Sequence, residues 1–178
     1  METSLSDGTV TLSPLGPDDG PAHLAGEDEQ LIRWLSGGPG TPEGVAAYLR
    51  HCAAQWAEGG SLRAFGIRVD GGRTLAGTID LRSEAEGLTR GQVNVAYGLY
   101  PAWRGRGLAT RAVLLVCRYA AGVGGRAAVI QVEPGNAASA AVARRAGFTP
   151  GGQRFADDGT LFDRYVRELG DSSGSTAL

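Results

Sequence analysis

Two arginines and two glycines lie within six residues, RGRGLA at 104–109, between a predicted strand and a predicted helix. Glycine lets the backbone turn tightly and leaves its N–H groups uncovered by Cβ atoms. Amides at a helix N-terminus favour anions, and the arginine side chains add positive charge at the same place. The stretch therefore predicts an anion site that suits a phosphate or pyrophosphate. A glycine-rich turn without any ligand is the alternative.

Two common phosphate-binding motifs do not fit this stretch. A P-loop needs Gly-Lys followed by Ser or Thr, and no Gly-Lys pair occurs in the chain. A dinucleotide fingerprint needs a third glycine or an alanine where Thr110 stands. The predicted anion is therefore held by another kind of loop.

The pattern that fits is [Q/R]-x-x-G-x-[G/A], which is met by Arg104, Gly107 and Ala109. A second string follows: N-x-x-S begins at Asn136, and A-x-x-x-G-F occupies residues 143–148. Together the two ordered motifs resemble the GCN5-related N-acetyltransferases (GNAT family), particularly the RimJ/RimL-like branch. The resemblance implies acetyl-CoA as co-substrate. It also implies a central strand that splays from its neighbour near 97–99, where Gly98 is compatible with a bulge. The cofactor-binding residues that it implies are Leu99, Arg104, Gly105, Arg106, Gly107, Leu108, Ala109, Thr110 and Asn136.

Acetyl transfer to an amine needs a protonated leaving thiolate and a deprotonated amine. Ser139 lies three residues after Asn136 on one face of the predicted late helix, and the resemblance implies that it protonates the thiolate. Relatives carry an acid at the positions of Asn94 or Gln131, and an amide cannot accept the proton. Glu133 shares a strand face with Gln131 by alternation, so it is the candidate base.

Other proton acceptors remain open, namely Asp80, Asp163 and a chain of water molecules. Ser139 on a helix surface and Glu133 charging the first turn of the late helix are the structural alternatives. Two functions follow. The chain is an N-acetyltransferase acting on a primary amine, or a catalytically silent CoA-binding or regulatory protein of the same fold.

The acceptor is undetermined between a protein or peptide N-terminus and a small molecule such as an antibiotic, a polyamine or an amino acid. Three consecutive acids at 27–29 fit either a solvated helix start or contacts to a cationic acceptor. Because early helices flank the acceptor groove in the resembling family, Trp34, Tyr48 and Trp56 are candidates to line it.

Hydrophobic periodicity gives the elements that would position these residues. Alternation predicts strands at 9–12, 65–69, 75–81, 93–99, 127–132, 148–155 and 162–169. Helical spacing and caps predict helices within 17–35, over 41–59, from 107 to about 122 and over 136–147. The order β-α-α-β-β-β-α-β-α-β-β predicts an α+β fold with a mixed, mostly antiparallel sheet flanked by helices.

Composition bounds the remaining expectations. The 178 residues predict a single domain at 9–169 with flexible termini at 1–8 and 170–178. A net charge of −2 gives no indication of a nucleic-acid partner. Cys52 and Cys117 are expected as buried reduced thiols, and no residues show metal-ligand spacing. Without a signal peptide or a long apolar run, we expect a cytoplasmic protein that does not contact membranes, either monomer or homodimer.

Overall fold

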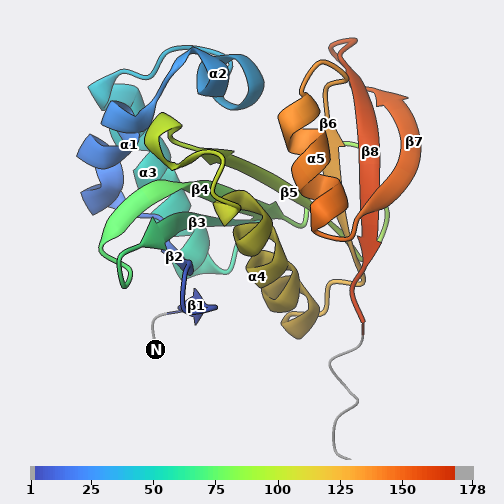
Figure 1. Cartoon of the computed structure of the whole chain (residues 1–178), viewed down its shortest axis with the longest axis horizontal. Coiled ribbons are helices and arrows are strands. Elements are labelled where there is room, and N and C mark those ends of the chain that lie inside the picture. Colours follow the sequence, from blue (N-terminus) through green and yellow to red (C-terminus); the bar gives the residue numbers. More distant parts are fainter. Residues whose placement is uncertain (1–2, 171–178) are drawn as a thin grey trace, which may run out of the picture.

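The computed structural model describes residues 3–170 and is built around an eight-stranded sheet of order β1-β2-β3-β4-β5-β6-β8-β7 (Figure 1). Neighbouring strands are antiparallel except β5 and β6, which are parallel. The strands are β1 (Leu5–Ser6), β2 (Thr11–Pro14), β3 (Leu62–Val69), β4 (Thr74–Arg82), β5 (Gln92–Leu99), β6 (Ala127–Val132), β7 (Thr149–Phe155) and β8 (Leu161–Glu168).

Within residues 3–170, five α-helices and three other helical segments connect these strands. The α-helices are α1 (Gly20–Gly26), α2 (Glu29–Leu31), α3 (Pro42–Glu58), α4 (Leu108–Gly122) and α5 (Ala137–Arg145). A π-helical segment, Ile32–Ser36, continues α2, and short 3-10 turns occupy Pro17–Asp19 and Pro101–Trp103. The predicted α+β fold with a mixed, mostly antiparallel sheet is confirmed.

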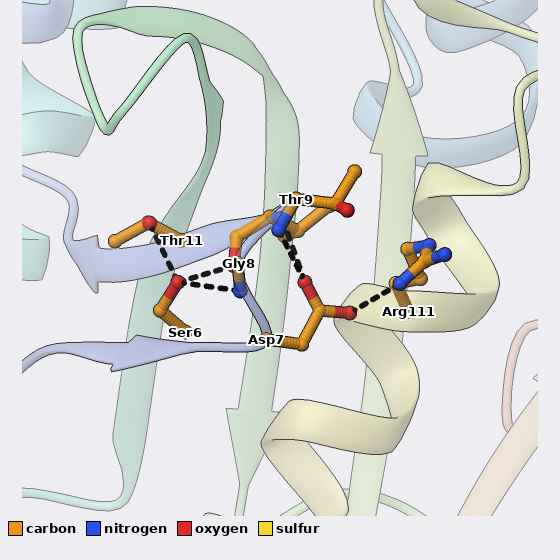
Figure 2. Close-up of polar contacts among 7 residues, drawn as sticks. Ser6, Asp7, Gly8, Thr9, Thr11 and Arg111 are labelled. Carbon is orange, nitrogen blue, oxygen red and sulfur yellow. Dashed lines mark hydrogen bonds and ion pairs between the residues drawn. The ribbon is translucent and has the colours of Figure 1, made fainter.

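The N-terminal segment differs from the flexible terminus expected at 1–8, because Leu5–Ser6 pairs with β2 as an edge strand. The turn after it is closed by Asp7, whose carboxylate accepts hydrogen bonds from the amides of Thr9 (2.9 Å) and Val10 (2.8 Å). Its other oxygen pairs with Arg111 on α4 at 2.9 Å (Figure 2). These bonds attach the segment to the sheet and to α4. Of the flexible end expected at 170–178, all residues but Gly170 lie outside the described residues.

Two helices begin at the capping residues that the sequence predicts. Thr41 caps α3 by accepting a hydrogen bond from the Gly44 amide at 3.1 Å, and Pro42 follows in the first helical position. Asn136 caps α5 in the same way, accepting from the Ser139 amide at 3.2 Å. Both helices begin within one residue of the predicted starts.

Helices cover both faces of the sheet, and each face has its own apolar core. The larger core lies between the strands and α4 and includes the fully buried Phe65, Ile79 and Val116. The smaller one lies under α1 and α3, around Leu49 and Cys52. Helix α4 crosses one face, α1 and α3 lie against the other, and α5 packs beside β6 and β8 (Figure 1). The sheet is therefore a central layer whose two faces can hold different groups.

Candidate active site

The sheet splits along the boundary between β5 and β6. Their parallel pairing extends only from Gln92 to Asn94, and beyond it β5 continues to Leu99 without β6. The Tyr100 amide donates to the Ala76 carbonyl on β4, so by alternation the N–H groups of Tyr97 and Leu99 face the split. The splay predicted near 97–99 is thus present.

Gly98 does not form the bulge that seemed compatible with its position, because β4 and β5 pair without a register shift from Gly77 to Arg82. Its lack of a side chain has another cause. A Cβ at Gly98 would lie 2.5 Å from the Leu31 side chain and 3.0 Å from that of Leu35. The glycine allows the segment that follows α1 to lie directly on β5.

A cavity of about 550 Å³ occupies the split, within the range of small-molecule sites. Its walls are formed by α2 with the π-helical segment, by the end of β5, by the loop into α4 with the first turn of that helix, and by α5 with its cap. The lining residues of the first two are Gln30, Leu31, Trp34, Leu35, Tyr97, Gly98 and Leu99. Those of the loop and the two following helices are Arg104, Gly105, Gly107, Leu108, Ala109, Thr110, Asn136, Ala138, Ser139, Ala141, Val142 and Arg145.

The loop before α4 has the backbone that an anion site needs. Gly105 and Gly107 both have a φ of +73°, a conformation that favours glycine, and a Cβ on either would meet nothing within 4 Å. The free amides at the start of α4 therefore open onto the cavity. Thr110 lines the same wall, and its hydroxyl, which is buried, has no hydrogen-bond partner within residues 3–170. A buried hydroxyl without a partner fits a group that accepts its proton from the cavity.

The two loop arginines do not converge on this spot as the sequence suggests. Arg104 forms a bidentate ion pair with Asp28, at 2.7 and 2.8 Å, and its Nε donates to the Leu99 carbonyl at 3.0 Å. Arg106 stacks over the Trp103 ring, 5.0 Å from its centroid, and does not line the cavity. The reason is that Asp28, which is distant in the sequence, occupies the guanidinium group of Arg104. The same guanidinium holds the pKa of Asp28 below its usual range.

Ser139 meets Tyr97 across the split. The Ser139 hydroxyl donates to the Tyr97 hydroxyl at 3.0 Å, and Tyr97 donates to the Ser139 carbonyl at 2.9 Å. Burial raises the pKa of Tyr97 to about 12, although the bond from Ser139 lowers it. Both hydroxyls therefore remain protonated at neutral pH in the wall of the cavity. Sequence reasoning named Ser139 and overlooked Tyr97, although strand alternation was enough to place that side chain opposite Gly98.

Glu133 lies beside the cavity and not in its lining. Its carbonyl accepts from the Asn136 amide at 2.8 Å, and its half-buried carboxylate has no hydrogen-bond or ion-pair partner in the part of the chain that the structure describes. It is placed to charge the turn before α5, and it follows the last residue of β6, so the shared strand face with Gln131 stays a prediction.

Asn94 and Gln131, the two amides at positions where the family resemblance implies an acid, contact each other. Gln131 Nε2 donates to Asn94 Oδ1 at 3.2 Å, and Arg154 donates to Gln131 Oε1 at 3.3 Å. Arg154 is also paired with Glu86. This network holds both amides in place, and neither amide can accept the proton of an ammonium.

Asp80 is the most buried of the alternative acids. Burial raises its pKa, opposed by its ion pair with Arg82 at 3.0 Å, and its Oδ1 has no partner among residues 3–170. It lies under α3 near Tyr48 and is separate from the cavity lining. Asp163, on β8, accepts from Gln153 at 2.7 Å.

Of the three aromatic residues expected to line the acceptor groove, one lies in the cavity lining and two lie elsewhere. Trp34 lines the cavity. Tyr48 lies near Asp80, and Trp56 packs edge-on against Phe65 while donating to the Ala64 carbonyl at 2.8 Å. Only Trp34 of the three is available to a ligand in the cavity.

A model of the acetyltransferase (GNAT) domain matches residues 9–149, most of the chain. The protein belongs to the GNAT acetyltransferase family. The family resemblance inferred from the two motifs is therefore confirmed. No curated protein sequence matches this chain.

Solved structures share the fold of this GNAT chain over nearly its whole length. RimL, the ribosomal L7/L12 alpha-N-protein acetyltransferase, in complex with coenzyme A, superposes with a TM-score of 0.78 at 19% identity, covering 95% of this chain and 98% of its own. A probable GNAT acetyltransferase from Chromobacterium violaceum gives 0.79 at 23% identity, covering 98% and 90%. The structure of AAC(6')-Ib in complex with paromomycin and acetyl-CoA gives 0.76 at 19% identity, covering 90% and 93%.

Cys52 and Cys117 are free thiols buried in α3 and α4. Burial raises the pKa of each to about 11. Over residues 3–170, no three His, Cys, Asp or Glu side chains are grouped to hold a metal ion. No helix in this range is long and apolar enough to span a bilayer.

Proposed function

We propose that this GNAT protein transfers the acetyl group of acetyl-CoA to a primary amine, either a protein or peptide N-terminus or the amine of a small molecule such as an antibiotic. The observation that carries the proposal is the cavity at the sheet split. It joins the anion-binding start of α4 to a hydroxyl pair and then to the opposite face of the sheet.

The residues present fit acetyl-CoA. The amides that open α4 suit the pyrophosphate, because they are N–H donors to a dianion, and Thr110 lies in the same wall with a buried hydroxyl that lacks a partner in the described residues. The N–H groups of Tyr97 and Leu99 face the split, where they suit the pantetheine arm and the thioester oxygen. Arg104 acts by holding the loop to Asp28, and Arg145 adds a positive charge to the cavity wall.

The chemistry needs an attack by the neutral amine nitrogen on the thioester carbonyl carbon. Negative charge then develops on the carbonyl oxygen, and backbone N–H groups of β5 are aimed at that region. As the C–S bond breaks, the departing sulfur takes the hydroxyl proton of Ser139, which in the free protein is donated to the Tyr97 hydroxyl, and the serine oxygen regains a proton from solvent. The proton lost by the amine passes to Glu133 or to water.

The acceptor is proposed at the level of a primary amine. RimL is named for acetylating a protein N-terminus, and the AAC(6')-Ib structure contains an antibiotic, so the shared fold is compatible with both classes. The alternative is a CoA-binding protein without turnover, which the amides at Asn94 and Gln131 favour because they supply no base.

One experiment separates these functions. The full chain is incubated with acetyl-CoA and a panel containing a free-N-terminus peptide, an aminoglycoside and simple alkylamines, while free thiol and acetylated product are measured. We expect thiol release that depends on the amine and a product that gains one acetyl group. A peptide blocked at its N-terminus is the matched control. CoA binding with no amine-dependent thiol release would instead support the silent protein.

A further inference from the structure

The two faces of β5 carry the two sides of the cavity. Tyr97 points to α5, where it meets Ser139, and Gly98 points to the opposite face, where Leu31 and Leu35 cover it. The loop into α4 and α5 therefore form the cofactor side. The segment Gln30–Leu35 forms the other side, from which an amine can approach the split.

This second side, the acceptor wall, is apolar and partly exposed. It consists of Leu31, Trp34 and Leu35, with Gln30 at its edge. Leu35 is 44% exposed, so its side chain is accessible from solvent. Trp34 spans the split, because its ring lies 3.3 Å from where a Cβ on Gly135, in the loop before α5, would stand. An apolar surface held open at a site is available to an apolar part of a ligand.

The charged residues that line the cavity have one sign, although the charge of Arg104 is offset by its ion pair with Asp28. Within the described chain, none of the residues that line the cavity is Asp or Glu, and its two charged side chains are Arg104 and Arg145. The Trp34 ring, which could otherwise bind an ammonium, already has the Arg33 guanidinium 4.4 Å from its centroid.

Two of the three acids at 27–29, which could have contacted a cationic acceptor, instead bind groups within the protein. Glu27 accepts from the Gly40 amide at 2.6 Å. Asp28 caps α2 through the Leu31 amide and pairs with Arg104. Glu29 remains exposed, outside the cavity lining. A second ammonium on the acceptor would find no carboxylate at the wall.

We propose that the acceptor is a primary amine carried on an apolar or aromatic group, without a second positive charge, and that Trp34 and Leu35 select it. The proposal rests on the acetyltransferase function proposed above and narrows it. Polyamines and aminoglycosides are disfavoured because each would place additional ammonium groups against Leu31, Trp34 and the neighbouring arginines. A peptide N-terminus with an apolar first residue and a small apolar amine both have the required chemistry.

The test compares two amines with the same six-carbon chain, hexylamine and hexane-1,6-diamine, whose only difference is a second ammonium in place of one hydrogen of the terminal methyl group. Thiol release from acetyl-CoA gives kcat/KM for each, divided by its number of amino groups. We expect hexylamine to be preferred at least about tenfold, the scale on which apolar pockets discriminate small groups. Equal use of the two amines, or preference for the diamine, would overturn the proposal while leaving the acetyltransferase function intact.

A negative charge placed on the wall should weaken or abolish the preference for hexylamine. Leu35→Glu supplies a carboxylate at an exposed position, so the variant should fold and should lower the hexylamine-to-diamine ratio by about tenfold. Val123→Glu is the matched control, because Val123 is 62% exposed and lies outside the cavity lining. That control should keep the wild-type ratio. A Leu35→Glu ratio equal to that of the control would contradict a role for Leu35 in selection.

If neither amine is acetylated, the selectivity of the acceptor wall can still be measured as binding. Calorimetry of each amine with the CoA-loaded protein then compares binding alone, and tighter binding of hexylamine supports the proposal. Tighter binding of the diamine, or no binding of hexylamine, overturns it. Failure of the acetyltransferase function itself gives a different pattern, since no amine or peptide of any charge would then release thiol.

Discussion

The hydroxyl of Ser139 donates to the hydroxyl of Tyr97 at 3.0 Å, and Tyr97 donates back to the carbonyl of the same serine at 2.9 Å. One residue comes from α5 and the other from β5, on opposite sides of the split. The two hydroxyls therefore form one hydrogen-bonded unit in the cavity wall.

Ser139→Ala and Tyr97→Phe should each lower kcat by about 10²-fold, the scale of general acid catalysis. Because the two groups act together, the double variant should lose little more than either single variant. Turnover at saturating acetyl-CoA and CoA affinity by calorimetry are the measurements, and affinity should change much less than kcat. Losses that multiply in the double variant would show that the two hydroxyls act independently.

Thr110→Val should weaken CoA binding and leave the unliganded protein at least as stable. The hydroxyl is buried without a partner, so its removal costs no bond in the free protein. A hydrogen bond to a charged phosphate is worth about 1.5–3 kcal/mol, which corresponds to a loss of affinity of at least about tenfold. Calorimetry with CoA and thermal unfolding without it are the measurements. Thr110→Ser, which keeps the hydroxyl, should bind as the wild type does, and unchanged CoA affinity in Thr110→Val would remove Thr110 from the site.

Arg104 should act through Asp28 and not by direct contact with phosphate. Asp28→Asn keeps a side-chain oxygen for the helix cap while removing the charge of the ion pair. If Arg104 only holds the loop, Arg104→Gln should weaken CoA binding in the wild type and much less in the Asp28→Asn background. CoA affinities of the four proteins give this coupling. An equal loss in both backgrounds would mean that the guanidinium contacts the pyrophosphate, as the sequence motif suggested.

Glu133→Gln should separate a base from a residue that only charges the turn before α5. As a base, Glu133 is needed most where the amine is protonated, so the variant should lose activity at neutral pH and recover part of it as pH rises. As a charge near the helix dipole it should contribute only about 0.3–1 kcal/mol of stability, with a normal pH profile. The measurement is kcat/KM against pH with one amine. Wild-type turnover at every pH would exclude Glu133 from the mechanism.

Asp80→Asn should change how stability depends on pH. Burial raises the pKa of Asp80, so between its unfolded value of 3.8 and its higher folded value the native state binds more protons than the unfolded state. The contribution of Asp80 to stability therefore decreases as pH rises through this window and stays low above it. The groups that face the carboxyl are Arg82 on β4, His23 on α1, and Tyr48 on α3, with Cys52 beside Tyr48.

Urea unfolding at several pH values, for the wild type and for Asp80→Asn, isolates this effect. The stability of the wild type relative to the variant should fall with increasing pH. A relative stability that rises with pH would show that the Arg82 pair outweighs burial. His23 has its own pKa lowered mainly by burial, so its titration should be checked with a His23→Gln variant.

Much of the site could be predicted from the sequence because its signals are local. Gly105 and Gly107 adopt positive φ at the start of α4, and Asn136 caps α5 through an amide three residues away. Such features depend on neighbours within one helical turn, which a motif records directly. The predicted fold class and the family followed from the order of these elements and the spacing of the two motifs.

What the tertiary structure decided concerns partners far apart in the chain. Arg104 belongs to a phosphate-loop motif by its neighbours, yet its guanidinium binds Asp28, 76 residues away. Tyr97 and Ser139, 42 residues apart, meet only because β5 and β6 separate after Asn94 and bring α5 across the gap. The sequence alone determined the turns, the helix starts and the caps, because backbone conformation is set largely by near neighbours. Which charge is neutralised inside the protein, and which hydroxyl faces the cavity, depended on long-range packing that no local pattern contains.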